Sequence, residues 1–183
     1  MLGLRRIISL AFVAVACASK LAARQATNTN ARINPIIDSV DETLRHVGPA
    51  ILTLQADHKL STSTLATQMT ALEMEFTNAT KQLAAIPVSS GSTTVHPTND
   101  DISITLADAI ALVSTSLSGI IPSGAVPGFP TMVATFDPIM ANMLSQFNTT
   151  LPGGITLVNT MMRDARQFLV EEGFTRTNTV LGF

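Results

Sequence analysis

Residues 65–86 read LATQMTALEMEFTNATKQLAAI, and their apolar side chains recur in alternating steps of four and three. The repeated positions are Leu65, Met69, Leu72, Phe76, Ala79, Leu83 and Ile86. Because an α-helix completes a turn every ~3.6 residues, this spacing places these side chains on one face of a helix. The stretch therefore predicts an amphipathic helix with a continuous apolar stripe and a polar opposite face.

Four further stretches also carry apolar residues in steps of three and four. Residues 33–57 have the stripe Ile33, Ile37, Val40, Leu44, Val47, Ile51 and Leu54. The later stripes are Ile102, Leu106, Ile110, Val113, Leu117 and Ile120; then Val133, Phe136, Met140, Met143 and Phe147; then Ile155, Val158, Met162, Ala165 and Leu169. No segment alternates with period two for long enough to predict a strand. The sequence therefore predicts an all-α domain over residues 33–173, a four- to five-helix up-and-down bundle.

The first 18 residues have the plan of a secretory signal peptide. Arg5 and Arg6 precede an apolar run, and small residues precede a cleavage point after Ala18. The run is shorter than the roughly 20 residues of a spanning helix, which disfavours a membrane anchor. A lipoprotein signal, with Cys17 as the lipidated residue, is the remaining alternative. We therefore expect a secreted, extracellular protein with no transmembrane span in the mature chain.

The segments that flank the bundle lack the apolar spacing. Residues 19–32 are polar and aperiodic, so we expect a disordered arm between the signal peptide and the bundle. Residues 174–183 follow a glycine that is suited to closing the last helix, so we expect them to be a flexible tail.

The composition excludes disulfides and disfavours nucleic acid as a partner. Cys17 is the only cysteine and falls inside the predicted signal peptide. Without Arg5 and Arg6, nine Lys and Arg residues face 13 Asp and Glu residues, and the chain has no Trp or Tyr. Because nucleic-acid binding requires a basic patch and stacking rings, we expect no nucleic-acid partner. The polar helix faces consist mainly of Ser and Thr, as in STST at residues 61–64.

Prolines and capping residues set the expected helix boundaries. The first helix is expected to begin at Asn34-Pro35, where Asn caps and Pro suits the first turn. Pro49 and Pro138 lie opposite the apolar stripes of their helices, where a proline either kinks or breaks the helix. Residues 87–98 and 122–130 are predicted loops, and the second is longer than a tight hairpin needs.

The histidines and serines do not form a recognisable catalytic or metal-binding pattern. There is neither a GxSxG motif nor a cysteine in the predicted mature chain. His46, His58 and His96 share no ligand spacing and are interpreted as surface or loop residues. We therefore expect no enzyme activity, no metal and no cofactor.

Two acidic pairs have a structural interpretation, because sequence neighbours do not face each other on a helix. Asp100 and Asp101 follow the capping candidates Thr98 and Asn99, so they are interpreted as partners of the helix dipole. The second pair, Glu171-Glu172, is interpreted as a solvated last turn.

Methionine and phenylalanine are concentrated in the last two helical stretches. Met adapts to irregular apolar partners, which suits a fatty-acid cavity or an adsorbing face, and core filling is the alternative interpretation. Two arginines flank the last stripe and are placed to meet a head group, or else form a plain exposed pair. The candidate lipid or surface contacts are Phe136, Met140, Met143, Phe147, Met161, Met162, Phe168, Arg163 and Arg166.

The chain contains two N-glycosylation sequons, at Asn78 and Asn148. Asn78 lies off the apolar stripe of its helix, and Asn148 lies at the end of the fourth helix. Both positions are therefore predicted to accept a sugar without disturbing the core.

Taken together, the signal peptide, the absence of mature cysteine and the helices rich in Ala, Leu, Ile, Thr and Ser resemble a known family. The acidic-capped stretch TNDDISITLADAIALVSTSLSGI, at residues 98–120, adds to the resemblance. The family is the fungal hydrophobic surface-binding protein A family, also called the cell wall galactomannoproteins, and the resemblance covers residues 33–173. It implies a secreted or cell-wall-associated helical glycoprotein that adsorbs to hydrophobic surfaces, with recruitment of a secreted esterase as a further expectation.

Some relatives in that family hold fatty acids between helices, and the family transfers no catalytic residues. The Pro-rich loop at residues 122–130 and the many Met and Phe residues depart from its pattern, which leaves the lipid-cavity option open. The sequence thus predicts a non-enzymatic binder of hydrophobic surfaces or, as the alternative, a carrier of fatty acids or other lipids in an apolar cavity between helices.

Overall fold

The computed structural model describes residues 27–183, and within them every regular element is a helix. The long helices are α2 (Asn30–Ala56), α3 (Thr62–Ala84), α4 (Asn99–Leu117) and α6 (Phe129–Thr150). The short ones are α5 (Ile120–Ser123), α7 (Gly154–Met161), α8 (Arg166–Glu171) and α9 (Thr175–Leu181). The all-α prediction is confirmed, with more helices than expected. The predicted signal peptide and residues 19–26 of the predicted arm lie outside the described residues.

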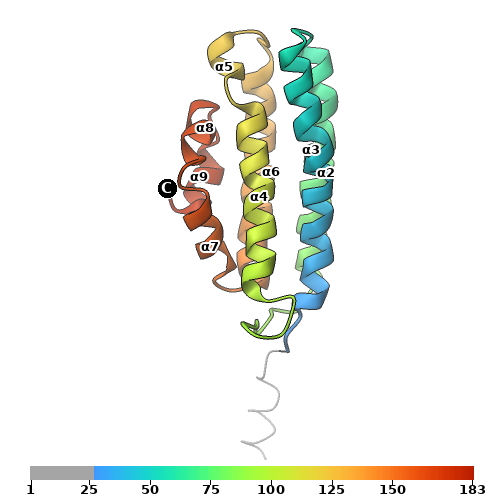
Figure 1. Cartoon of the computed structure of the whole chain (residues 1–183), viewed down its shortest axis with the longest axis vertical. Helices are drawn as coiled ribbons and strands as arrows, with labels where there is room; N and C mark the ends of the chain where they lie inside the picture. The colour runs from blue at the N-terminus through green and yellow to red at the C-terminus, as the bar shows by residue number, and fades with distance from the viewer. Residues whose placement is uncertain (1–26) are drawn as a thin grey trace, which may run out of the picture.

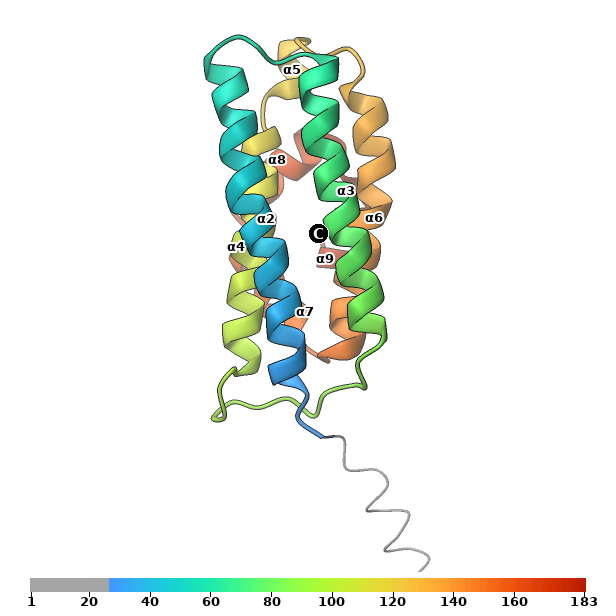
Figure 2. The ribbon, with the colours of Figure 1, turned by 90° about the vertical axis from the view of Figure 1, so that its right-hand side faces the viewer.

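The helices form a ring around one core (Figures 1 and 2). α2 packs between α4 and α3, and α3 packs between α2 and α6. The backbones of α4 and α6 lie apart, and the last three helices fill the side between them, with α7 on α4 and α9 on α6. We call residues 154–183, which contain α7, α8 and α9, the C-terminal segment.

Helix directions alternate along the chain, yet some neighbours in the ring run parallel. α2 is parallel to α4, and α3 is parallel to α6, because the connections cross the ends of the bundle (Figure 2). Residues 85–98 pass below the start of α2 to reach α4, and residues 118–128 cross the other end. The crossings explain why both predicted loops are longer than a tight hairpin.

Two long helices begin with reciprocal side-chain caps. Ser61 Oγ accepts the Thr64 N–H at 3.2 Å, and Thr64 Oγ1 accepts the Ser61 N–H at 2.9 Å. At α4, Thr98 Oγ1 accepts the Asp101 N–H at 3.1 Å, and Asp101 Oδ2 accepts the Thr98 N–H at 2.8 Å. The Thr98 N–H and then the His96 ring lower the pKa of Asp101. The predicted start of the third helix at Thr98 is therefore confirmed, with Asp101 as part of the cap.

α2 begins at Asn30, so the predicted cap at Asn34-Pro35 is wrong. The helix continues through both Pro35 and Pro49, and α6 continues through Pro138, so none of these prolines ends its helix. Beside Pro49, Gly48 is buried, and a Cβ atom there would lie 2.9 Å from Leu112 Cγ on α4. The missing side chain lets α2 and α4 approach closely.

A buried polar network explains the early start of α2. Asn30 is fully buried; its Nδ2 donates to the Pro97 carbonyl at 3.0 Å and to Asn99 Oδ1 at 2.9 Å. Ser89 Oγ donates to Asn30 Oδ1 at 2.8 Å and accepts the Thr29 N–H at 3.0 Å. Because these bonds attach the chain to the 87–98 loop, the prediction of a disordered arm is wrong for residues 29–32.

The predicted fifth helix and flexible tail are replaced by three short helices. Residues 162–165 interrupt the fifth helix between α7 and α8, and the tail residues form α9. Phe174 and Leu181 are buried, and they continue the three-and-four spacing through Thr177. Thr177 is fully buried, and its Oγ1 donates to the Asp137 carbonyl at 3.3 Å. The tail prediction is wrong because a threonine occupies the middle position of this stripe.

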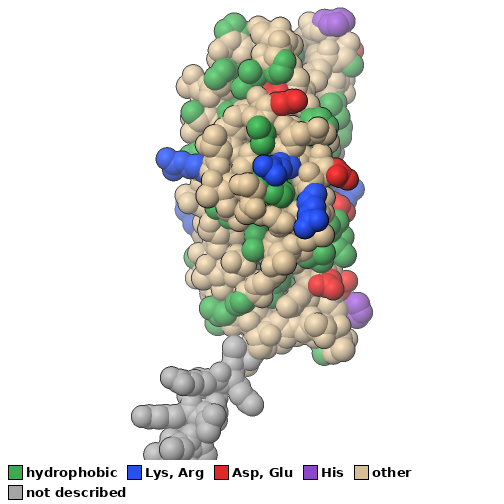
Figure 3. Space-filling view, turned by 90° about the vertical axis from the view of Figure 1, so that its left-hand side faces the viewer, with side chains coloured by type: hydrophobic (Ala, Val, Ile, Leu, Met, Phe, Trp, Pro, Cys, Tyr) green, Lys and Arg blue, Asp and Glu red, His purple; other side chains and the backbone are tan. Residues whose placement is uncertain are grey.

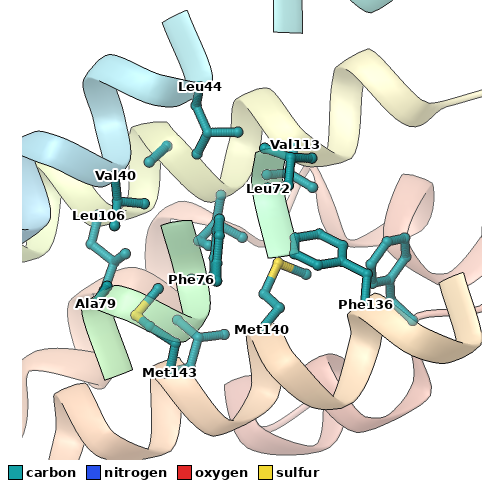
Figure 4. Close-up of a cluster of buried hydrophobic side chains, with 14 of the residues drawn as sticks. Val40, Leu44, Leu72, Phe76, Ala79, Leu106, Val113, Phe136, Met140 and Met143 are labelled. Atoms are coloured by element: carbon teal, nitrogen blue, oxygen red, sulfur yellow. The ribbon is translucent and has the colours of Figure 1, made fainter. Parts of the chain in front are cut away.

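The core fills the centre of the ring (Figure 4). Phe76 and Phe136 meet edge to face with ring centroids 5.2 Å apart, and Phe136 meets Phe174 in the same way at 6.1 Å. Among the surrounding side chains are Val40, Leu44, Leu72, Ala79, Leu106, Val113, Met140 and Met143. The predicted stripe residues are buried except for Leu54, Ile155 and Ala165, which are partly buried. The predicted stripes therefore meet in one core.

Candidate functional site

The apolar surface of this protein lies mainly inside the ring. The large apolar side chains that remain exposed are spread over most of the helices and the 87–98 loop: Leu52, Met74, Val88, Val95, Ile104, Ile121, Met161 and Val170. Figure 3 shows apolar side chains scattered over the face that carries the C-terminal segment. In the closed bundle, the largest apolar area is therefore the covered one.

Most of the candidate lipid or surface contacts belong to the core. The fully buried ones are Phe136, Met140, Met143, Phe147 and Met162. Met161 is 39% exposed, and Phe168 is half-buried. The structure thus brings the α6 candidates together in the ring but closes them off from solvent, as the core-filling interpretation describes.

Arg163 and Arg166 lie on the outside of the C-terminal segment. Both are exposed and line one open groove together with Asp164, Gln167, Val170 and Glu171. The Arg166 guanidinium carbon lies 5.1 Å from the centre of the Phe183 ring, a cation–π contact. The two acidic residues of the groove balance the two arginines in formal charge. This balance favours the plain exposed pair over an anionic head-group site.

A buried carboxylate joins the end of α8 to the turn between α4 and α5. Glu172 is 1% exposed; its Oε1 accepts the Gly119 N–H at 2.6 Å and its Oε2 accepts the Ile121 N–H at 2.9 Å. Burial raises the pKa of Glu172, and the Glu171 charge adds to the rise, while the backbone N–H groups act in the opposite direction. The expectation that the pair Glu171-Glu172 is solvated is wrong for Glu172.

A second buried carboxylate joins α6 to the start of α9. Asp137 is 4% exposed; its Oδ1 accepts the Thr177 N–H at 2.8 Å and its Oδ2 accepts the Arg176 N–H at 2.9 Å. These N–H groups belong to the first turn of α9, which has no side-chain cap of its own. Asp137 therefore provides from another helix what a capping residue normally provides locally.

Sequence reasoning missed both carboxylates, although their spacing carries a signal. Glu172 lies three residues after Leu169, and Asp137 lies four after Val133 and three before Met140. Both positions therefore continue an apolar stripe. A charged residue on such a stripe is predicted to be buried and to need partners.

The histidines and sequons lie on the outside. His46 and His58 are exposed, and His96 is exposed with its Nδ1 2.6 Å from Asp101 Oδ2. Residues 27–183 contain no group of three or more His, Cys, Asp or Glu side chains arranged to hold a metal ion. Asn78 and Asn148 are both exposed, as their predicted placement requires.

A recess of about 320 Å³ opens at one end of the bundle, near the α2–α3 turn and α5. Its lining combines apolar and polar side chains: Gln55, His58, Leu60, Ser118, Gly119, Ile120, Ser123 and Ala125. Met140, Met143 and Met162, which are candidate lipid contacts, do not line this recess. The recess is therefore distinct from the predicted lipid cavity between the helices.

The α4 region is long and strongly apolar. Asn99–Ser123 is long and apolar enough to cross a membrane by length and composition, and half of its most apolar window is buried inside the protein. It packs against α2, α7 and α8, and a packed core helix meets the same criterion.

Comparison with known proteins adds no relative: no family model matches the chain, and no curated protein sequence matches it.

Proposed function

We propose that this chain is a secreted, non-enzymatic protein that binds hydrophobic surfaces through its amphipathic helices. The observation that carries the proposal is that all four long helices bury a long apolar stripe, while the outer apolar side chains are dispersed. Because the stripes face one another in the closed ring, binding requires the bundle to open. The outer faces, rich in Ser and Thr, keep the closed form compatible with water.

The free energy of burying apolar surface supports an exchange of contacts between helices for contacts with a hydrophobic surface. Removing apolar surface from water stabilises a protein by roughly 25 cal/mol per Å², whether the partner is another helix or an apolar solid. Opening in water loses that stabilisation, whereas opening on a hydrophobic surface replaces it. The only cysteine is Cys17, so no disulfide ties one described helix to another.

The resemblance to the hydrophobic surface-binding protein A family supports the same function. It extends the proposal to a location outside the cell or in the cell wall, to glycosylation at Asn78 or Asn148, and to recruitment of a secreted esterase. Both asparagines are exposed and lie away from the core. We propose no nucleic-acid partner, because the chain is mildly acidic and lacks Trp and Tyr.

The alternative proposal is a carrier of fatty acids or other lipids. The favouring observation is that Met140 and Met143 lie beside Phe76 at the centre of the ring (Figure 4). Methionine is flexible, so these side chains are able to rearrange around an acyl chain. In this alternative the lipid would occupy the middle of the closed ring.

The test is depletion of the intact secreted protein from solution by polystyrene beads, with hydrophilic silica beads as the control. Surface binding predicts loss to polystyrene and retention in solution with silica. Native mass spectrometry of the same preparation tests the alternative. A stoichiometric bound lipid together with no depletion on polystyrene would reject surface binding and support the carrier.

A further inference from the structure

We infer that the hydrophobic surface is engaged by the sides of α4 and α6 that the C-terminal segment covers, and that this segment is the part that moves away. The inference rests on the proposed function and specifies its binding surface. The partner it fits is an uncharged apolar phase, because the covered interior is predominantly apolar.

The position of the C-terminal segment makes it the removable side of the ring. Every other side is a direct contact between long helices: α4 with α2, α2 with α3, and α3 with α6. Only the side between α4 and α6 is closed by short helices (Figure 2). Moving residues 154–183 outward opens the ring without separating any pair of long helices.

The helices of the C-terminal segment are also much less able to persist alone than the long helices. α7, α8 and α9 have 8, 6 and 7 residues, whereas α2 and α3 have 27 and 23. Isolated helices shorter than about 12–15 residues are marginal in water. The segment therefore depends on its packing against the bundle, and opening is expected to start there.

The contacts that hold the segment are mainly apolar. Its buried large apolar side chains are Val158, Met162, Leu169, Phe174 and Leu181. Phe174 packs directly on Phe136, which in turn packs on Phe76. When the segment moves outward, Phe174 leaves Phe136, and an apolar partner gains access to the aromatic centre of the core.

Two polar attachments supplement the apolar ones. Asp137 binds the first turn of α9, and Glu172 binds the turn before α5. When the segment lifts, water can replace these hydrogen bonds, while the apolar surface replaces the lost packing. Both attachments oppose opening, so removing either should make opening easier.

The experiment is hydrogen–deuterium exchange with mass spectrometry on the full chain, free in solution and adsorbed on polystyrene nanoparticles. We expect amides of residues 154–183 to lose protection on adsorption, while those of α2 and α3 keep it. Retained protection of residues 154–183 in the adsorbed protein would overturn the inference but leave surface binding intact. Failure to adsorb would reject the proposed function itself.

Variants of the attachments supply a second readout. Asp137→Ala and Glu172→Ala should each increase the adsorption rate by about fivefold, the factor that corresponds to one lost cap. Ser61→Ala is the matched control, because it removes a helix cap from α3, which packs against α2 and α6. Its adsorption rate should stay within about twofold of the wild type. Equal acceleration by all three variants would attribute adsorption to general instability and overturn the inference.

Discussion

At the scale of single residues, Glu172 has a pH-dependent role. Burial raises its pKa, the Glu171 charge adds to the rise, and the N–H groups of Ile121, Gly119 and Ile120 act in the opposite direction. The folded state therefore holds the Glu172 proton more tightly than the unfolded state does. The stabilisation that comes from this tighter proton binding is fully present below the ordinary pKa of a glutamate and is lost as the pH rises through the raised pKa. The hydrogen bonds that the carboxylate accepts from Gly119 and Ile121 are a separate contribution.

This direction of the pH dependence gives a prediction for Glu172→Gln, a variant of similar shape whose side chain does not titrate. The free energy of unfolding of the wild type, minus that of the variant, should fall as the pH rises from about 4 to about 7. Denaturant unfolding of both proteins across this range measures the difference. A difference that stays constant with pH would show that Glu172 titrates as an ordinary surface carboxylate.

Gly91 provides a residue-scale test of the polar network around Asn30. It has a φ of +72°, and a Cβ atom there would lie 2.5 Å from Asn99 Nδ2, which belongs to that network. Gly91→Ala should therefore lower the free energy of unfolding by about 1–3 kcal/mol more than Gly124→Ala. Gly124 also has a positive φ, of +63°, but nothing lies within 4 Å of its Cβ position. Equal losses in the two variants, measured by denaturant unfolding, would mean that backbone strain alone matters at Gly91.

At the scale of elements, the packing of α9 and of Phe174 before it predicts a loss of stability that a flexible tail would not cause. Phe174 is fully buried against Phe136, so Phe174→Ala should lower the free energy of unfolding by about 3 kcal/mol or more. Val170→Ala, at a nearby side chain that is 55% exposed, should change it by less than about 0.5 kcal/mol. Thermal or denaturant unfolding compares the two. A negligible effect of Phe174→Ala would mean that the segment does not pack as described.

The elements also show what the sequence can and cannot predict. The stripes of α2, α3, α4 and α6 were predictable because each repeats a strict spacing of three and four over several turns. The part of the chain after Leu169 was not, because its buried positions include Glu172 and Thr177, whose polarity hides the stripe. Their partners, Gly119 and Asp137, lie far away in the chain, so only the folded structure reveals them.

The same limit applies to the candidate binding residues. The concentration of Met and Phe in the last two helical stretches predicted an apolar site, and the structure places Phe136, Met140 and Met143 together. Composition alone does not distinguish a core from a binding surface, because both require apolar side chains. The ring arrangement adds the missing information, since it shows which segment covers them.

At the scale of the whole molecule, the fold has two unequal parts. α2, α3, α4 and α6 are connected through direct helix pairs, and the crossing loops attach their ends. The C-terminal segment completes the ring through short helices and two carboxylates. Such a construction allows the long helices to keep their hydrogen bonds while the apolar interior becomes accessible.

The most direct test of this account is a distance between spin labels on α3 and α8, at Met74→Cys and Val170→Cys. These side chains are 69% and 55% exposed, and residues 27–183 contain no native cysteine. A second pair, Leu52→Cys with Met74→Cys, reports on the α2–α3 contact as a control. On adsorption to polystyrene nanoparticles, the account predicts a longer Met74–Val170 distance and an unchanged Leu52–Met74 distance. An adsorbed protein in which both distances equal those in solution would contradict opening of the bundle.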